Sequence, residues 1–355
     1  QGGRSFSAIL GFVIMTNTIK LIGTVVLIFT LFACGSTRQL SSSVDNLEIM
    51  LTDGKGQGLE QVSGLTQFEN YLFFVAQKHN SLFYIDTETA LAAMKLGLKF
   101  LALEQLELTG QLPAEGSWEA VTIASVGGKD TVFLSYEHLG GDAANSAHKV
   151  YSGEVELRGG QPTLSKFRPF SQALPIAVDT RILSEDRTNF GYEAVTWSQR
   201  HERLLLVPEL TGLSALLIAD EQAPNSLFTG AHGLRISDLT QLTGSQCLLG
   251  VSFCYRDDPI CHKNGSESAL SLAMIELHQN SIKVTDVYDI SDKYLEIDSL
   301  NGTQKGVYNA EGITQASDML FMINDNKPGV GVGTVLKTMS LPLIQNENCA
   351  FSPTS

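Results

Sequence analysis

A short motif recurs five times along the chain, and each copy is followed by a second apolar run. Each copy has a serine or a glutamate at its second or third residue, continues mostly through small and aliphatic residues, and ends in threonine. The five copies occupy residues 61–66, 117–122, 191–196, 236–240 and 309–314. The apolar runs that follow them occupy residues 71–76, 131–136, 203–207, 247–253 and 319–323. A strand, a turn and a second strand that recur in this way predict a repeat fold.

The spacing of the copies predicts a β-propeller. The aligned first positions are Ser63, Glu119, Glu193, Ser237 and Glu311, separated by 56, 74, 44 and 74 residues. A four-stranded propeller blade takes roughly 40 to 50 residues, so each gap holds one blade with insertions. Five blades are expected, although the two longer gaps leave room for a sixth.

The remaining pattern predicts an all-β domain with a single short helix. Strand-like runs are short, and Gly, Asn and Asp turns are frequent between them. Residues 87–97 have near-helical apolar spacing, and residues 100–109 have the loose alternation of an outer strand. We therefore expect one propeller domain over residues 51–345, followed by a C-terminal tail over residues 346–355.

The charge balance disfavours a nucleic-acid partner. The 355 residues have a formal net charge of −14, whereas a nucleic-acid binder presents a basic face. An acidic surface is compatible with cation binding, but it is more often simply a solvated surface. We expect a monomer that binds no nucleic acid.

The N-terminal residues predict a secretory signal. The first 14 residues contain no methionine, so we take Met15 as the start and the preceding residues as upstream sequence. A short polar segment with Lys20 is followed by an apolar run over residues 21–31. That run is too short for a comfortable membrane span and is typical of a signal peptide.

The signal ends in a sequence that resembles the lipobox of bacterial lipoproteins. The residues are Leu31-Phe32-Ala33-Cys34-Gly35. The resemblance implies that residues 1–34 contain the signal, that cleavage precedes Cys34, and that Cys34 carries lipid. Since Gly35 is not aspartate, inner-membrane retention is not implied. An ordinary signal peptide with a chance cysteine is the alternative.

The predicted anchor gives a location and a linker. Residues 35–50 are mostly polar and rich in serine, which predicts a flexible tether. We expect a protein of the bacterial cell envelope, most simply at the outer membrane and facing the periplasm or the surface.

Four further cysteines predict disulfides. In an oxidising periplasm an even number is consistent with two bridges, and the sequence does not choose among three pairings. A zinc site is the weaker alternative, because no close pair with metal-ligand spacing is present. The four residues are Cys247, Cys254, Cys261 and Cys349.

Three of the aligned positions are glutamates, which predicts a shared polar site. The first strand of each blade lines the axis of a propeller, so Glu119, Glu193 and Glu311 are expected to converge. Converging carboxylates raise one another's pKa unless a counter-charge is present. A bound Ca²⁺ would supply it, with Ser63 and Ser237 completing the ring. A glutamate that simply begins a solvated strand is the alternative.

A second tier of polar residues follows where the next strand ends. Such residues lie near the expected ring and are candidate metal ligands or substrate contacts. The tier consists of Gln77, Glu137, Glu209, Ser252 and Asp325, of which Glu137, Glu209 and Asp325 carry carboxylates.

These motifs resemble a known family. The pieces Val62-Ser63-Gly64-Leu65, Trp118-Glu119-Ala120-Val121, Gly191-Tyr192-Glu193-Ala194-Val195, Ser237-Asp238-Leu239 and Ala310-Glu311-Gly312-Ile313 are similar to the SdiA-regulated (YjiK-like) family and the related esterase-like-phytase group. The resemblance spans about residues 57–340. It implies a five-bladed propeller with calcium at a site that includes blade-start carboxylates, and it carries no settled activity.

Two functions follow from these observations. The first is a lipid-anchored, non-catalytic propeller braced by Ca²⁺, whose loops bind a protein or a glycan. The second is a calcium-dependent hydrolase of phosphate esters, in which the metal activates water and Glu137, Glu209 or Asp325 acts as base. Few basic residues could hold a phosphate: Lys78, His79, His138 and Lys327, with no arginine cluster. We favour the first.

Overall fold

The computed structural model divides the chain into two compact units, Gln1–Ser43 and Val44–Ser355. The first unit, with Cys34 and the predicted signal, lies outside the described residues. The structure describes residues 47–77, 79–113, 117–137, 149–170, 192–208, 215–219, 225–228, 234–254, 269–278, 281–291, 295–297, 304–307, 309–324, 333–341, 344–345 and 349–351.

Five sheets of four or five strands make up the second unit. Sheet 1 contains β2 (Val62–Phe68), β3 (Tyr71–Ala76), β4 (Ser81–Asp86) and β6 (Glu104–Glu107). Sheet 2 contains β7 (Ser117–Val126), β8 (Lys129–Glu137), β9 (Lys149–Arg158) and β10 (Gln161–Leu164), with β11 (Arg168–Pro169) paired to β9. Sheet 3 contains β12 (Tyr192–Ser198), β13 (Arg203–Pro208), β14 (Ala215–Ala219) and β15 (Asn225–Phe228).

The other two large sheets follow the same plan. Sheet 4 contains β16 (Ile236–Gln241), β17 (Leu248–Cys254), β18 (Ala269–Leu277) and β19 (Ile282–Asp289). Sheet 5 contains β22 (Ala310–Ala316), β23 (Met319–Asn324), β24 (Val335–Ser340), β1 (Glu48–Thr52) and β5 (Phe100–Ala102). Two small hairpins join β20 (Leu295–Ile297) to β21 (Gln304–Val307) and β25 (Ile344–Gln345) to β26 (Ala350–Phe351).

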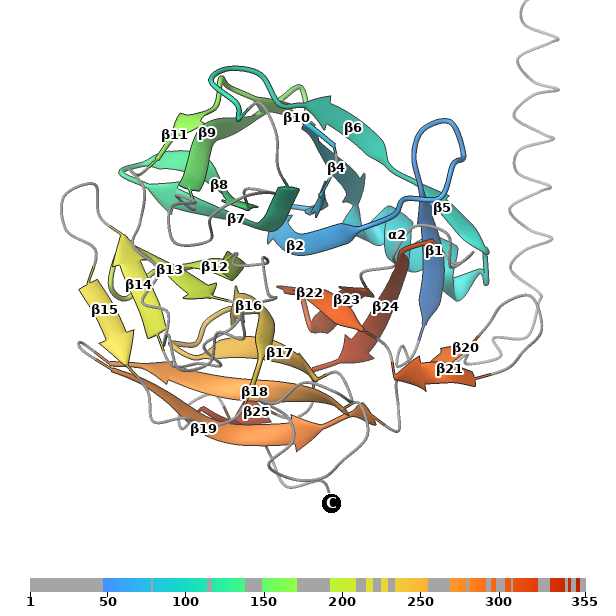
Figure 1. The fold of residues 1–355 in the computed structure, drawn as a ribbon. Helices are drawn as coiled ribbons and strands as arrows, with labels where there is room; N and C mark the ends of the chain where they lie inside the picture. The colour runs from blue at the N-terminus through green and yellow to red at the C-terminus, as the bar shows by residue number, and fades with distance from the viewer. Residues whose placement is uncertain are drawn as a thin grey trace, which may run out of the picture. The chain divides into compact units, whose positions relative to one another are not determined.

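The large sheets have the arrangement of a β-propeller (Figure 1). Each begins at one of the five motif copies, and the strand that carries the motif is the innermost. The innermost strands contact one another in the cyclic order β2, β7, β12, β16, β22 and back to β2. The all-β prediction and the propeller arrangement are thereby confirmed.

The hydrophobic core is divided among the interfaces between neighbouring sheets. On β3, Phe73 and Val75 pack toward sheet 2, whereas Phe74 packs against Phe321 and Ile323 of sheet 5. Successive side chains of a strand point to opposite faces, and here both faces are covered. This is why the second strand of each hairpin is a continuous apolar run rather than an alternating one.

The last sheet is completed by the N-terminal strand. Strand β1 pairs antiparallel with β24, and Lys337 Nζ contacts Glu48 Oε2 at 2.6 Å. Because β1 begins at Glu48, the last three residues of the predicted tether are part of the sheet. Pairing of strands from the two ends of the unit satisfies edges that would otherwise be exposed.

The predicted outer strand over residues 100–109 is in fact two strands. Strand β5 pairs parallel with β1 in sheet 5, and β6 pairs antiparallel with β4 in sheet 1. Leu103 lies between them and donates its N–H to Thr52 O at 2.9 Å. The segment crosses from one sheet to the next, which its loose alternation did not reveal.

One helix, α2 (Thr87–Lys95), is present among the described residues, where the sequence predicted it. Asp86 caps it by accepting a hydrogen bond from the Thr89 N–H at 2.8 Å. No helix within these ranges has both the length and the apolar character needed to cross a membrane.

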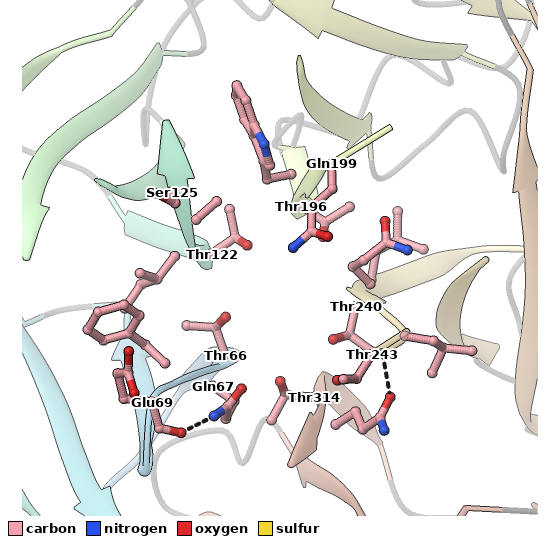
Figure 2. A pocket seen from close by; sticks show the side chains of 18 of the residues that line it. Thr66, Gln67, Glu69, Thr122, Ser125, Thr196, Gln199, Thr240, Thr243 and Thr314 are labelled. Atoms are coloured by element: carbon pink, nitrogen blue, oxygen red, sulfur yellow. Dashed lines mark hydrogen bonds between the residues drawn. The ribbon is translucent and has the colours of Figure 1, made fainter. Parts of the chain in front are cut away.

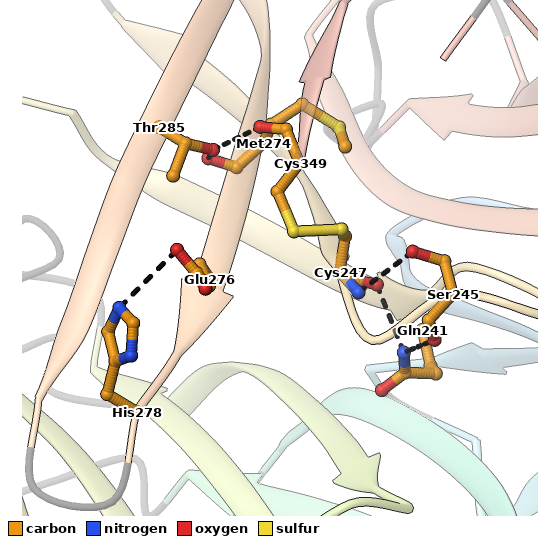
Figure 3. Close-up of a disulfide and its surroundings, with 8 residues drawn as sticks. All are labelled: Gln241, Ser245, Cys247, Met274, Glu276, His278, Thr285 and Cys349. Atoms are coloured by element: carbon orange, nitrogen blue, oxygen red, sulfur yellow. Dashed lines mark hydrogen bonds and ion pairs between the residues drawn. A yellow bond between two sulfur atoms is a disulfide. The ribbon is translucent and has the colours of Figure 1, made fainter. Parts of the chain in front are cut away.

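A disulfide joins Cys247, just before β17, to Cys349, just before β26 (Figure 3). The hydroxyl of Thr285 on β19 donates to the Cys349 carbonyl and holds the same segment. The C-terminal residues 349–351, which the sequence assigned to a tail, are therefore fastened to sheet 4. The side chain of Cys254 and all of Cys261 lie outside the described residues.

Candidate functional site

Every motif copy contains a β-bulge at its aligned serine or glutamate. In each large sheet the register between the innermost strand and its neighbour skips one residue. A bulge leaves the skipped residue unpaired and re-aims its side chain. The skipped residues are Ser63, Glu119, Glu193, Ser237 and Glu311. We call this end of the innermost strands the bulge end.

The three bulge-end glutamates are buried, with exposed fractions of 4% to 6%. Glu119 Oε2 accepts a hydrogen bond from Gln77 Nε2 at 3.1 Å, and Gln77 Oε1 accepts one from Gln61 Nε2 at 3.0 Å. Gln77 belongs to the predicted second tier, so the structure does bring one member of each tier together. Hydrogen bonds to an ionised carboxylate offset the cost of burying it.

An arginine balances the second glutamate. Arg235 Nη2 lies 3.9 Å from Glu193 Oε1, and both side chains are 8% exposed. Arg235 stands immediately before β16, so the pair links sheet 3 to sheet 4. The sequence analysis missed this counter-charge. The available signal was a cation two residues before Ser237, a place where the other copies have Gln, Ser, Gly or Asn.

Asp238 is the second functional residue that the sequence analysis did not single out. It occupies the position that is glycine or alanine in the other four copies. Its Oδ1 accepts from the Leu239 N–H and its Oδ2 from the Ile313 N–H, both at 2.8 Å. The carboxyl is fully buried, and it therefore ties β16 to β22 at the centre of the ring.

The innermost strands lie close to one another because most copies have glycine or alanine directly after the bulge residue. A Cβ atom on Gly64 would lie 2.8 Å from the Val121 N atom, and one on Gly312 would lie 2.9 Å from Leu65 Cβ. Those distances are well inside van der Waals contact. Asp238 is thus the one larger side chain at this level of the described ring.

Burial raises the pKa of Asp238 well above its usual range. Hydrogen bonds from the backbone of Ile313, Leu239 and Leu65 oppose the rise, because they favour the ionised form. The negative charge of Glu311 adds to it. A raised carboxyl pKa was expected among the three glutamates, which stays a prediction; the raised pKa of Asp238, to which the charge of Glu311 contributes, was not expected.

Calcium at the bulge end stays a prediction. Throughout the described ranges, no group of three or more His, Cys, Asp or Glu side chains is placed to hold a metal. Arg235 lies beside Glu193 and supplies a positive charge that the sequence analysis had assigned to a bound cation. The Glu137 side chain, Glu209 and Asp325 lie outside the described residues, so their roles stay predictions.

The two motif serines do not act alike. Ser63 Oγ donates to the Trp118 carbonyl at 2.6 Å and so links sheet 1 to sheet 2. Ser237 Oγ is fully buried and has no hydrogen-bond partner among the described residues.

A pocket opens at the other end of the innermost strands (Figure 2). It has a volume of about 370 Å³. The last residue of every motif copy lines it, so five threonines from five strands surround one opening: Thr66, Thr122, Thr196, Thr240 and Thr314. We call these residues the threonine ring.

The ring hydroxyls are available to a ligand. Four of the five threonines are buried and Thr240 is half-buried, yet their hydroxyl groups form no hydrogen bond with another described residue. A hydroxyl can donate one hydrogen bond and accept two. The ring therefore offers hydrogen-bond donors and acceptors at one place. Buried polar groups nearly always have a hydrogen-bond partner, so hydroxyls without one in the protein are suited to bind a ligand or water.

Glutamine side chains support the rim of the pocket. Gln67 Nε2 donates to the Glu69 carbonyl, and Gln315 Nε2 donates to the Ser317 carbonyl at 2.8 Å. Gln315 Oε1 also accepts the Thr243 N–H at 2.9 Å, which ties the β16–β17 turn to sheet 5. The rim is thereby held by contacts between and within sheets.

The remaining lining residues are neutral or acidic. Trp197, Phe68, Ile123 and Leu242 contribute apolar surface, and the described lining contains no lysine, arginine or histidine. Glu69 and Asp130 supply carboxylates. The threonines were visible in the repeated motif, but a hydroxyl at the end of a strand is too common in sequences to indicate a site by itself.

Comparison with known proteins gives structural likeness only. No family model matches the chain, and no curated protein is significantly similar to it. Similar solved structures include an α-L-arabinofuranosidase from Lactobacillus brevis, which is 12% identical, with 79% of this chain and 91% of that chain covered and a TM-score of 0.46.

Two further structures have comparable scores. An endo-arabinanase from Bacillus licheniformis is 11% identical, with coverage of 79% and 93% and a TM-score of 0.41. A glucose dehydrogenase is 13% identical, with coverage of 79% and 96% and a TM-score of 0.41. At these scores the neighbours carry no argument about activity, and membership of the SdiA-regulated or esterase-like-phytase families stays a prediction.

Proposed function

We propose that this chain is a non-catalytic binding protein of the bacterial cell envelope, anchored by lipid on Cys34. We further propose that the five sheets are the five blades of one propeller, and that the ligand occupies the pocket at the threonine ring. The observation that carries the proposal is the ring itself. Five hydroxyl groups from five blades face one cavity and have no partner among the described residues.

The pocket presents convergent polar groups, as binding sites do. Its lining is more polar than that of most ligand pockets, which are largely apolar. Here Trp197 and Phe68 supply aromatic surface, and the threonine hydroxyls converge from the strand ends. The polar groups stand on strands rather than on loops, so little ordering is needed when a ligand binds.

Binding is favoured over phosphate-ester hydrolysis by the charges around the pocket. A phosphate ester is commonly held by cationic side chains, and the described lining contains no lysine, arginine or histidine. Calcium at the bulge end, with Glu137, Glu209 or Asp325 as further ligands, is a separate proposal on which ligand binding does not depend. Calorimetric titration of Ca²⁺ into chelator-treated protein tests it, with Glu209→Gln as the variant expected to bind more weakly.

The binding proposal is tested with a thermal-shift screen of small metabolites against the chain lacking residues 1–34. A ligand that binds the folded state raises the melting temperature, by an amount that grows with the ratio of its free concentration to its Kd. Thr122→Val/Thr196→Val removes two ring hydroxyls at nearly constant shape and should abolish the shift. Thr163→Val on β10, outside the pocket, is the matched control and should keep it. Shifts that survive the double substitution would refute the pocket.

The anchor is tested separately. Cys34→Ala in the full chain should move the protein from the membrane fraction to the soluble fraction after expression in a Gram-negative host. Mass spectrometry of the N-terminal peptide should show diacylglycerol on Cys34 of the unsubstituted chain. Retention of the variant in the membrane fraction would contradict the lipoprotein prediction.

A further inference from the structure

We infer that the ligand of the threonine-ring pocket is an uncharged, polyhydroxylated carbohydrate. The inference rests on the proposed function, because it names the class of ligand for the same pocket. Four properties of the pocket lead to it: its volume, its hydrogen-bonding groups, its charge and its aromatic surface.

The volume suits a small ligand. Cavities that hold small molecules span roughly 300 to 1,000 Å³, and the pocket, at about 370 Å³, lies near the lower limit. One or two pyranose rings are of suitable size. A longer glycan would have to present its terminal unit and leave the rest outside.

The hydrogen-bonding groups match sugar hydroxyls. Each threonine hydroxyl can both donate and accept, and so can each hydroxyl of a sugar. Several such groups around one opening satisfy a ligand with hydroxyls on every side of its ring. The Gln199 amide and the Ser125 hydroxyl, which lie farther out in the pocket, extend the same chemistry (Figure 2).

The charge of the lining excludes anionic sugars. Glu69 and Asp130 are its charged groups among the described residues, and both are carboxylates. A sugar acid or a sugar phosphate would approach them without a compensating cation, which is unfavourable. A neutral sugar can instead donate its hydroxyls to the same carboxylates.

Aromatic surface supplies a face for a sugar ring. Trp197 follows ring residue Thr196 directly and lines the pocket. Its indole stacks on Phe133, with centroids 5.8 Å apart and planes within 4° of parallel. The stack fixes the orientation of the indole, which then presents a rigid apolar surface to the axial C–H groups of a pyranose. Rigid aromatic anchors of this kind lose little conformational entropy on binding.

Tryptophan fluorescence provides a direct test, because the chain has only two tryptophans. Trp118 is 2% exposed and packs in the interface between sheets 1 and 2, away from the pocket lining. The Trp118→Phe variant therefore leaves Trp197 as the single reporter. Trp197→Phe is the matched control, in which the remaining Trp118 should be silent to ligand.

The probes are matched sugars that differ in charge. Glucose, galactose, mannose, N-acetylglucosamine, maltose and cellobiose are the neutral panel; glucuronic acid and glucose 6-phosphate are the charged, anionic counterparts. We expect saturable quenching or a spectral shift of Trp197 with at least one neutral probe, and binding at least tenfold weaker for its charged counterparts. The Thr122→Val/Thr196→Val variant should bind the neutral probe about tenfold more weakly, or weaker still, since two hydrogen bonds are lost.

The failures of this inference and of the proposed function are distinguishable. If no neutral sugar binds, or if a charged counterpart binds more tightly, the carbohydrate assignment is overturned, and a pocket-dependent hit from the thermal-shift screen would still support the binding function. If ligands of every class bind equally well to the double-threonine variant, both are overturned.

Discussion

The carboxylate Oδ2 of Asp238 accepts a 2.8 Å hydrogen bond from the backbone N–H of Ile313, a residue 75 positions later in the chain. This contact joins the innermost strands of sheets 4 and 5 at a point that is fully buried. Because Oδ1 is held by the Leu239 N–H, the side chain has no freedom to turn away. Asp238 is therefore a fixed link in the centre of the propeller.

Removing this link should destabilise the fold strongly. Asp238→Ala leaves the buried backbone N–H groups that bind the carboxyl unpaired and creates a small void, and we expect a loss of about 2 to 5 kcal/mol in the free energy of unfolding. Urea denaturation followed by circular dichroism measures it. Ser237→Ala is the adjacent control: its hydroxyl is buried without a partner among the described residues, so the change should be within about 0.5 kcal/mol or stabilising. Equal losses for the two variants would contradict the account.

Stability should also depend on pH through Asp238. Its pKa is raised in the folded state, chiefly by burial and further by Glu311. The folded state then binds the proton more tightly than the unfolded chain, in which aspartate has a pKa of about 3.9. The stabilising contribution is complete below that pH and is lost as the pH rises through the folded pKa, by at most about 1.4 kcal/mol per pH unit.

Asp238→Asn isolates this effect, because asparagine does not titrate. The free energy of unfolding of the unsubstituted protein, measured relative to that of the variant, should fall as the pH rises above about 4. The variant itself starts from a lower baseline, since its amide cannot accept both backbone hydrogen bonds. Parallel pH profiles for the two proteins would mean that Asp238 is ionised over the whole range.

The Glu193–Arg235 pair should behave as a coupled unit. Glu193→Gln removes the negative charge that lies 3.9 Å from the buried Arg235 guanidinium, and we expect a loss of about 2 to 4 kcal/mol in the free energy of unfolding. The Glu193→Gln/Arg235→Met double variant should recover part of it, because neither charge then remains buried. A double-mutant cycle by urea denaturation gives the coupling, which should exceed about 0.5 kcal/mol. A coupling near zero would show that the two side chains are independently stabilised.

The Cys247–Cys349 disulfide should contribute substantially to stability. It closes a loop with a sequence separation of 102 residues. Chain-entropy arguments for such a loop give about 3 to 5 kcal/mol. Dithiothreitol should therefore lower the urea midpoint of the unsubstituted protein. The Cys247→Ala/Cys349→Ala variant should start from the lower midpoint, and any residual response to dithiothreitol in it would report a second bridge through Cys254 and Cys261.

Much of the fold was predictable because its signals are local. The innermost hairpins were predicted from the motif copies and the apolar runs that follow them. One of these strands, Tyr71–Ala76, has the predicted bounds. The crossing of residues 100–107 between two sheets was not predictable, since Leu103 makes its contacts with a strand fifty residues away. The pairing of Cys247 with Cys349 likewise depends on how the C-terminal segment folds back onto sheet 4.

The site was predictable only in part. The motif correctly placed Ser63, Glu119, Glu193, Ser237 and Glu311 at equivalent positions, because one repeated bulge produces them all. It did not reveal that Arg235 and Gln77 balance two of the glutamates. The threonine ring was present in every copy, but the cavity in front of it is a property of the assembled strands and not of any one repeat.

Methyl NMR of threonine tests the central claim, that the axial pocket binds ligand, most directly. Protein carrying ¹³C-labelled threonine methyl groups is titrated with the best ligand from the thermal-shift screen, and ring signals are assigned by single Thr→Val substitutions. The account predicts saturable shifts for the signals of Thr66, Thr122, Thr196, Thr240 and Thr314, while Thr89 on α2 and Thr163 on β10 stay unchanged. Shifts confined to threonines outside the ring would contradict it.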